Sequence, residues 1–323
     1  LLSVSVYKSI TLMDAYRIIW NHIIGVTYEP RSAEWWADFY IWNRALPRIC
    51  ACILAGASLA VSGALMQSLM NNPLADPYST GISSGACFGA VAAIIVGFSF
   101  SSFTGELGIL SNAFIGAMIP AAIIIIMSTR IRLTPATMIL VGTAISYFFN
   151  SLVTYMMVAT DADTLQRAYL WQVGSLNGIS WSSIPIMLMV TVAGSFIIML
   201  LSRKLNLLSL GDNSARSLGL DVKRFRIVCL AIMAFMTCAI ISYTGIIGFV
   251  GLVAPHVVRM VVGSDNKFVL PISMAVGVLL LLVADYIAVT LMNIPVGVVM
   301  SMIGSPIFFT LILWQRKSYG AIY

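Results

Sequence analysis

Long segments without a charged residue recur along this chain, and they constrain its fold more than any motif does. No Asp, Glu, Lys or Arg occurs between Arg48 and Asp76 or between Arg167 and Arg203, and similar gaps follow. A membrane-spanning helix needs about 20 mostly apolar residues. The chain has 60% hydrophobic and 9% charged residues and a mean hydropathy of +0.97, whereas soluble proteins carry about 25% charged residues. These features predict an all-α polytopic membrane protein with a single transmembrane domain over residues 1–323.

Nine spanning helices are predicted from the apolar segments. They lie near residues 49–70, 78–100, 109–129, 135–158, 182–202, 227–245, 249–262, 269–291 and 297–315. The segment 249–262 is short for a crossing and its start is rich in glycine, so a re-entrant segment is the alternative. Residues 1–6 are mostly apolar and are expected to be the tail of a truncated first helix, with a cleaved signal peptide as the alternative.

The distribution of Lys and Arg predicts the orientation of these helices. With a cytoplasmic C-terminus, twelve of the 18 basic residues lie on the inner side and six on the outer side. Cytoplasmic loops carry the excess of basic residues in membrane proteins. We therefore expect a multi-pass protein of the cell (inner) membrane with a cytoplasmic C-terminus. The net charge of +6 is attributed to topology and not to nucleic-acid binding.

Residues 7–44 differ from the rest of the chain because charged and aromatic side chains cluster there. The aromatic residues include Trp20, Trp35, Trp36 and Trp42. Trp and Tyr favour the headgroup level of a bilayer, so an amphipathic segment at the outer surface is one interpretation. A docking surface for an external partner is the other.

A polar segment that contains Pro73 and Pro77 separates the first two predicted spans. Proline cannot continue a helix and biases the residue before it toward an extended backbone, so Asn72 and Asp76 are expected where the chain turns. The segment is either an ordinary interhelical turn or a functional hinge.

Residues 211–223 lie in the one sizeable segment expected in the cytoplasm. Asp212 or Asn213 can cap a short helix that Gly219 ends, and Asp221 can cap a second. Two short helices joined at a glycine would form a compact knob at the membrane surface. This knob is either a solvated connection or the place where a cytoplasmic motor protein pushes.

Polar residues form a stripe along the predicted span 135–158. Thr143, Ser146, Asn150 and Thr154 are spaced by three and four residues, which places them largely on one helical face. Such a stripe suits close helix packing or the lining of a water-filled translocation path.

Asp285 is an acidic residue inside the predicted span 269–291. A carboxylate within a bilayer is costly and is by default a hypothesis of function, here an ion site. The alternative is a structural acceptor that ties broken helix ends together, which the lack of a second acid or base at the midplane favours.

Motifs for catalysis, nucleotide binding or metal binding are absent from the sequence. It contains no G-x-x-x-x-G-K-[ST] and no H-E-x-x-H motif, and its five cysteines show no C-x-x-C spacing. We therefore expect a protein that is not an enzyme, with no catalytic residue, no metal site and no cofactor bound by this chain.

A series of motifs in fixed order resembles the FecCD family, the permease subunits of type II ATP-binding-cassette (ABC) importers for iron siderophores and cobalamin. The resemblance runs from Leu1 to about Trp314. Its elements are Ala-Leu-Pro-Arg at 45–48, Gly-Ala at 56–57, Ser-Gly-Ala at 62–64 with Gln67, Asn-Pro-Leu-Ala-Asp-Pro at 72–77, residues 81–86, Gly-Ser at 174–175, Leu-Gly-Asp at 210–212, Ala215, Leu-Gly at 218–219, residues 245–256, Ala-Asp at 284–285 and Ile-Pro-Val-Gly at 294–297.

The resemblance implies a ten-helix subunit that pairs with a second copy of itself around a central path within the lipid bilayer. Two cytoplasmic ATPase subunits would use ATP, and an external substrate-binding protein would deliver the cargo. Ferric siderophore is the first expectation for that cargo, with haem, cobalamin and molybdate as the others. Nucleic acid is not an expected partner.

The resemblance also implies roles for single residues. The cytoplasmic gate would include Asn72, Leu74, Thr134, Pro135, Ala136 and Thr137, although Pro135 and Ala136 stand where a relative has hydroxyl residues. Coupling to the ATPase would involve Gly211, Asp212, Ala215, Arg216, Leu218 and Gly219. Docking of the binding protein would use Arg44 and Arg48.

An ion-coupled secondary transporter is the competing interpretation, since such proteins also use broken helices and midplane polar residues. Asp285 would then be the ion site. Dependence of uptake on an ATPase subunit or on an ion gradient discriminates between the two classes.

Overall fold

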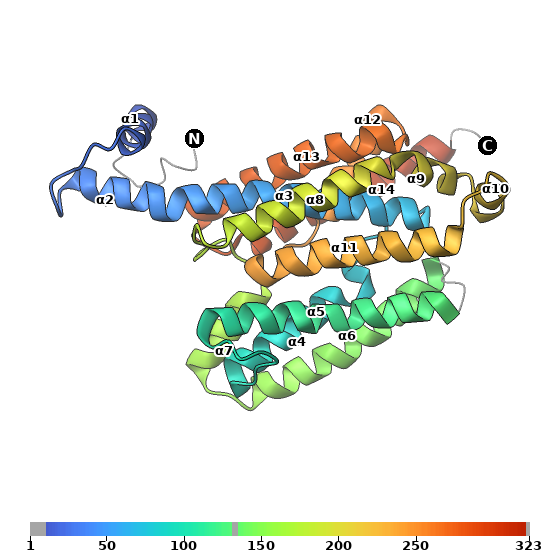
Figure 1. Ribbon diagram of the computed structural model, residues 1–323, viewed down its shortest axis with the longest axis horizontal. Coiled ribbons are helices and arrows are strands. Elements are labelled where there is room, and N and C mark those ends of the chain that lie inside the picture. The colour runs from blue at the N-terminus through green and yellow to red at the C-terminus, as the bar shows by residue number, and fades with distance from the viewer. Residues whose placement is uncertain (1–10, 131–134, 321–323) are drawn as a thin grey trace.

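The computed structural model describes residues 11–130 and 135–320, and in these ranges the chain is helical without a β-strand. In chain order the α-helices are α1 (Leu12–Ile23), α2 (Ala33–Tyr40), α3 (Leu46–Met70), α4 (Ile82–Val91), α5 (Gly105–Arg130), α6 (Pro135–Val158), α7 (Ala162–Gln172), α8 (Ile184–Leu200), α9 (Ser202–Ser209), α10 (Asp212–Ser217), α11 (Val222–Thr244), α12 (Val250–Val262), α13 (Asn266–Ile287) and α14 (Val296–Gly320). Shorter elements are the π-helical turns η1 (Ile41–Ala45), η3 (Ala92–Val96) and η4 (Ala288–Met292) and the 3₁₀ turn η2 (Pro77–Thr80). The long helices run along one axis, with α1 and α2 at one end and α10 at the other (Figure 1).

Helix α3 is the centre of the fold. All of residues 51–70 except Ile53 are buried, against α8, α12 and α13 among other helices. Glycines allow the closest approaches, since a Cβ atom at Gly63 would lie 1.8 Å from the carbonyl oxygen of Gly251 on α12. Small residues at such contacts let helices pack tightly in a bilayer, where apolar side chains gain nothing by leaving lipid.

Helices α4, α5, α6 and α7 form a second group beside the α3 group, and α11 packs against both (Figure 1). Within this group α4 and α5 approach closely. A Cβ atom at either Gly85 or Gly116 would lie 2.4 Å from the other's carbonyl oxygen. The two groups are connected through the segment 71–81 at the α10 end and through the loop after α7 at the α2 end.

The apolar helices agree with the predicted spans in position. Within the described residues, five helices are long and apolar enough to cross a membrane, or six if α8 and α9, which meet at a bend of 54°, count as one span. The same part of the chain has three shorter apolar helices, at Ile82–Val96, Val250–Val262 and Val296–Leu311. Each of the nine predicted segments therefore contains an apolar helix, and the count of nine crossings stays a prediction.

The first described long helix begins earlier than the sequence predicts. Helices α2, η1 and α3 form one continuous helix of 38 residues, Ala33–Met70, which is about 57 Å at 1.5 Å per residue and longer than the roughly 30 Å apolar core of a bilayer. Pro47 lies inside it, two residues after the end of the π-turn η1. Proline cannot pair with the carbonyl group of the preceding turn, and a π-turn relieves that mismatch without ending the helix.

Part of the predicted external segment thus extends this helix beyond the bundle, and α1 folds back on the extension. Ala15 and Ile18 of α1 are buried against Ala37 and Ile41. The opposite face of α1 exposes large apolar side chains, namely Met13, Tyr16, Trp20 and Ile23. This helix is amphipathic, as one of the two interpretations of the segment requires.

Candidate functional site

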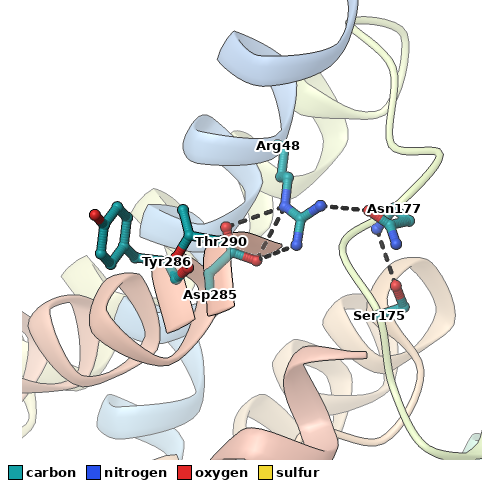
Figure 2. Close-up of polar contacts among 6 residues, drawn as sticks. All are labelled: Arg48, Ser175, Asn177, Asp285, Tyr286 and Thr290. Carbon is teal, nitrogen blue, oxygen red and sulfur yellow. Dashed lines mark hydrogen bonds and ion pairs between the residues drawn. The ribbon is translucent and has the colours of Figure 1, made fainter. Parts of the chain in front are cut away.

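A buried ion pair joins the start of α3 to the end of α13 (Figure 2). Arg48 Nε donates to both carboxylate oxygens of Asp285 at 3.0 Å, and Arg48 Nη2 donates to Asp285 Oδ1 at 2.6 Å. Arg48 Nη1 donates to the side-chain carbonyl of Asn177, in the loop between α7 and α8. The Asp285 side chain is 2% exposed and that of Arg48 is 16% exposed. We call these three residues the Arg48 clasp.

The loop that carries Asn177 is also held by backbone hydrogen bonds. Ser175 N donates to Thr244 O at 2.8 Å at the end of α11, and Gly297 N in the first turn of α14 donates to Gly174 O at 3.1 Å. Asn177 N donates to Ser175 Oγ at 3.1 Å (Figure 2). The clasp and this loop therefore gather the ends of α3, α11, α13 and α14 at one place.

This arrangement bears on two predictions from the sequence. A carboxylate that receives a two-point contact from a guanidinium is held in a strong, directional interaction, so Asp285 has the environment of a structural acceptor and not that of an open ion site. Arg48 points at Asp285, whereas Arg44 is exposed on η1. Of the two arginines predicted to dock a partner, Arg44 is the one with its side chain at the surface.

The polar segment after α3 turns sharply and then reaches a break in another helix. Asn71 has a left-handed backbone with φ of 46°, and Asn72 Oδ1 accepts a hydrogen bond from Leu74 N at 3.0 Å. Beyond the turn, Tyr78 Oη donates to Ile247 O at 3.0 Å, within the interruption between α11 and α12. Asn72 is half-buried and Leu74 is 44% exposed. The turn is therefore closed by its own hydrogen bond at its start and is bound to the bundle at its far end.

Helix α6 rests directly on η2, the short helix that follows this turn. A Cβ atom at Gly142 would lie 1.8 Å from Ser79 O, and one at Gly81 would lie 2.9 Å from Cγ2 of Ile145. The backbones of the two elements thus touch, and any displacement of η2 is felt by α6 without an intervening side chain.

The other predicted gate residues lie at the start of α6, before this contact. Pro135 is the first residue of α6, Ala136 is exposed and Thr137 is half-buried. Thr134 lies outside the described residues. The backbone contact with η2 is at Gly142, almost two turns beyond Ala136.

A pocket of about 310 Å³ lies where α6 meets η2. It is lined by Ser79, Thr143, Ser146, Tyr147 and Asn150. Three of the four residues predicted for the translocation path therefore line one cavity, and the fourth, Thr154, is exposed one turn further on and donates to Asn150 O at 2.8 Å. Sequence reasoning missed Ser79, because no pattern in the sequence around it shows that the 3₁₀ turn η2 packs against α6.

The predicted coupling segment contains one short helix and then the start of a span, not two short helices. Helix α10 begins at Asp212 and Gly219, with φ of 86°, follows its end. Asp221 caps α11 instead of a second short helix, since its carboxylate accepts from Arg224 N at 3.1 Å. The long apolar run after residue 226 explains the difference, because it lets the second capped helix continue into the bundle.

The side chains of α10 are divided between the bundle and solvent. Ala215 is fully buried, whereas Arg216 and Leu218 are exposed, the latter by 59%. Gly211, which precedes α10, has φ of 94°, a backbone conformation that favours glycine. An exposed apolar side chain beside an exposed cation on a projecting helix is a surface suited to contact with another protein.

Carboxylates cap helices at both ends of the bundle, outside the apolar spans. The backbone N–H of Thr164 lowers the pKa of Asp161 at the start of α7. At the start of α13, the backbone N–H of Lys267 and the side chain of Asn206 lower the pKa of Asp265. Both groups are charged at neutral pH and fix helix ends through hydrogen bonds.

Metal-ligating residues are not clustered in the part of the chain that the structure describes, where no group of three or more His, Cys, Asp or Glu could hold a metal ion. Cys52, Cys87, Cys229 and Cys238 are buried and Cys50 is half-buried, all as free thiols. They occupy positions in apolar helices, as small hydrophobic residues do.

A bundle of long apolar helices with a buried clasp and a projecting α10 defines a polytopic membrane protein. The family model for the FecCD transport family matches residues 1–314. The cobalamin import system permease protein BtuC of Halobacterium salinarum is 38% identical over 87% of this chain and 75% of its own length. The hemin transport system permease protein HmuU of Yersinia pestis is 36% identical over 94% of this chain and 89% of its own.

A solved structure shows the same fold. An inward-facing metal-chelate type ABC transporter superposes with a TM-score of 0.80 over 92% of this chain and 96% of that chain, at 27% identity. The chain therefore belongs to the FecCD transport family, as an ABC transporter permease.

Proposed function

We propose that this chain is the transmembrane subunit of an ATP-driven importer that moves a metal chelate, with ferric siderophore as the first candidate. The single observation that carries the proposal is membership of a family whose relatives are named for hemin and cobalamin import. The solved neighbour is likewise of metal-chelate type. Haem, cobalamin and molybdate are the remaining candidates for the cargo.

The assembly contains two copies of this chain in the cell membrane, with the C-terminus in the cytoplasm. Two cytoplasmic ATPase subunits bind and hydrolyse ATP, and an external binding protein delivers the cargo. The chain itself binds no cofactor in this scheme. The α2 end of the bundle then faces outward and the α10 end faces the cytoplasm, which agrees with the excess of Lys and Arg around α10.

In this scheme α10 and the hinge have separate roles. Helix α10 presents Arg216 and Leu218 to the ATPase, and Ala215 anchors it to the bundle. The hinge with Asn72 and Leu74 forms the cytoplasmic gate.

The pocket beside the hinge is lined by hydroxyl groups, an amide and one aromatic ring, and it is part of the translocation path. Because η2 touches the backbone of α6, movement of the gate changes the shape of that path. Exposed Arg44 contributes to docking of the binding protein by steering an acidic partner.

An ion-coupled secondary transporter is not favoured by these observations. Its ion site would be Asp285, and both oxygens of that carboxylate are bound by Arg48. A coupling ion would have to displace a buried guanidinium, which leaves a cation without its partner in an apolar surrounding.

The cargo is tested with purified permease, ATPase subunit and binding protein in liposomes. The probes are a ferric trihydroxamate, haemin, cobalamin and molybdate, each radiolabelled. We expect ATP-dependent accumulation of the ferric chelate and, at most, weak accumulation of molybdate. Accumulation of none of the three metal chelates, with the complex intact, would overturn the proposal.

A further inference from the structure

Helix α3 ends directly before the hinge, and its last carbonyl groups need hydrogen-bond donors from outside the helix. The turn supplies one of them, since Asn72 N donates to Gln67 O at 3.1 Å. Leu69 O is bound differently, by Arg226 Nη2 at 3.4 Å. A cationic side chain is favourable at this position, because the carbonyl dipoles make the C-terminal end of a helix negative.

The same guanidinium holds α10. Arg226 Nη2 donates to Asp212 Oδ1 at 3.1 Å and Arg226 Nη1 donates to Asp212 Oδ2 at 3.4 Å. Asp212 is the first residue of α10, and Arg226 lies in the second turn of α11. A two-point contact between a guanidinium and a carboxylate fixes orientation as well as distance. Arg226 therefore joins the first turn of α10 to the last turn of α3.

The guanidinium of this bridge is largely buried, in contrast to that of a neighbouring ion pair on the same helix. The Arg226 side chain is 18% exposed and that of Asp212 is 42% exposed. Arg224 pairs with Asp221, three residues before it, and these side chains are 88% and 55% exposed. An exposed pair is screened and loosely held, whereas a partly buried pair is screened less. Arg224 is therefore a natural control for Arg226.

The last turns of α3 are also attached to helices beyond α11. Arg259 Nη2 on α12 donates to Ser68 Oγ at 2.7 Å, and Ser68 Oγ donates to Asn266 Oδ1 on α13 at 2.7 Å. Because of these bonds, a displacement of Leu69 moves the end of α3 together with α12 and α13 instead of unwinding the last turn of α3.

We propose that Arg226 is a positioning residue that carries the displacement of α10 to the hinge at residues 71–77. The inference rests on the proposed function, in which α10 contacts the ATPase and the hinge is the gate. When α10 moves, the two-point contact with Asp212 moves the guanidinium with it. The hydrogen bond to Leu69 O then displaces the last turn of α3, two residues before Asn71 turns the chain. No sequence motif indicates this role, because Leu69 lies 157 positions from Arg226 along the chain.

The test measures hinge movement and ATP hydrolysis in the same sample. The whole complex carrying Asn72→Cys is reconstituted in nanodiscs, and the rate of labelling by a charged maleimide is measured with and without ATP and vanadate. The chain without Asn72→Cys gives the background from native cysteines. Arg226→Ala and Arg226→Lys are compared with Arg224→Ala in this setting.

We expect nucleotide to change the labelling rate at least fivefold in the parent and in Arg224→Ala. Arg226→Ala should hydrolyse ATP within twofold of the parent but show less than a twofold labelling change. The change in labelling rate for Arg226→Lys should lie between those of the parent and Arg226→Ala, because an ammonium group keeps the charge but not the planar geometry of the guanidinium.

Three outcomes overturn the inference. A full labelling response in Arg226→Ala would overturn the bridge alone and leave the proposed function intact. Loss of ATPase binding in Arg226→Ala but not in Arg224→Ala would make Arg226 an assembly contact instead. A parent that does not respond to nucleotide would overturn the gate assignment and, with it, the bridge.

Discussion

The Arg48 clasp supports a quantitative prediction about stability. In Arg48→Met the guanidinium is lost and the Asp285 carboxylate, 2% exposed, stays in an apolar surrounding without its cation. Removing one partner of a buried ion pair costs about 3–5 kcal/mol. Replacing both partners by apolar residues of similar size is often neutral, so Arg48→Met/Asp285→Leu should recover most of that loss.

The free energies of unfolding are measured in mixed micelles by tryptophan fluorescence, with Arg224→Met as the matched control. Arg224 belongs to an exposed pair, so its substitution should cost less than about 1 kcal/mol. The affinity for the external binding protein is measured for the same variants. If Arg48 acts only inside the clasp, the double variant should bind the partner like the wild-type chain.

Two results would refute this reasoning. A loss for Arg48→Met no larger than that for Arg224→Met would show that the carboxylate is not isolated from water as its exposure indicates. A double variant that recovers its stability but stays deficient in partner binding would show that Arg48 also contributes to docking.

Three further predictions follow from backbone and pocket geometry. Gly219→Pro should leave the protein in the membrane while uncoupling ATP hydrolysis from uptake, because φ of 86° is outside the range of proline; wild-type uptake would contradict it. Gly142→Leu forces apart the backbones of α6 and Ser79, which are already too close for a Cβ atom, and should cost about 1–3 kcal/mol of unfolding free energy; an unchanged midpoint in the same micelles would contradict it. Asn150→Leu removes an amide from the pocket and should reduce the uptake rate at least tenfold at unchanged ATP hydrolysis, whereas Ser151→Ala should not; equal uptake by the two variants would contradict it.

The helical segments could be predicted from the sequence because the constraint behind them is local. A backbone in a bilayer must satisfy its own hydrogen bonds, so apolar runs of sufficient length form helices. The predicted start of the first long helix was wrong, and the reason is also local. The first span was expected near residues 49–70, but η1 accommodates Pro47 within a helix that begins at Ala33.

The contacts that assemble the site could not be predicted in the same way. Asp285 was expected to tie helix ends together, but its partner Arg48 lies 237 positions away, and sequence separation carries no information about packing. The approach of Gly142 to Ser79 is equally non-local. The polar stripe on α6 was identified from helical spacing, whereas its position beside the hinge depends on how α6 packs on η2.

The most direct test of the central claim is the energy source for uptake. Vesicles containing the permease and the external binding protein are loaded with ATP, with or without the ATPase subunit, and accumulation of the chelate is followed while ionophores collapse proton and sodium gradients. Accumulation against a concentration gradient is expected only when the ATPase subunit is present, with no loss on adding ionophores. Accumulation without the ATPase subunit that disappears with the ion gradients would contradict it.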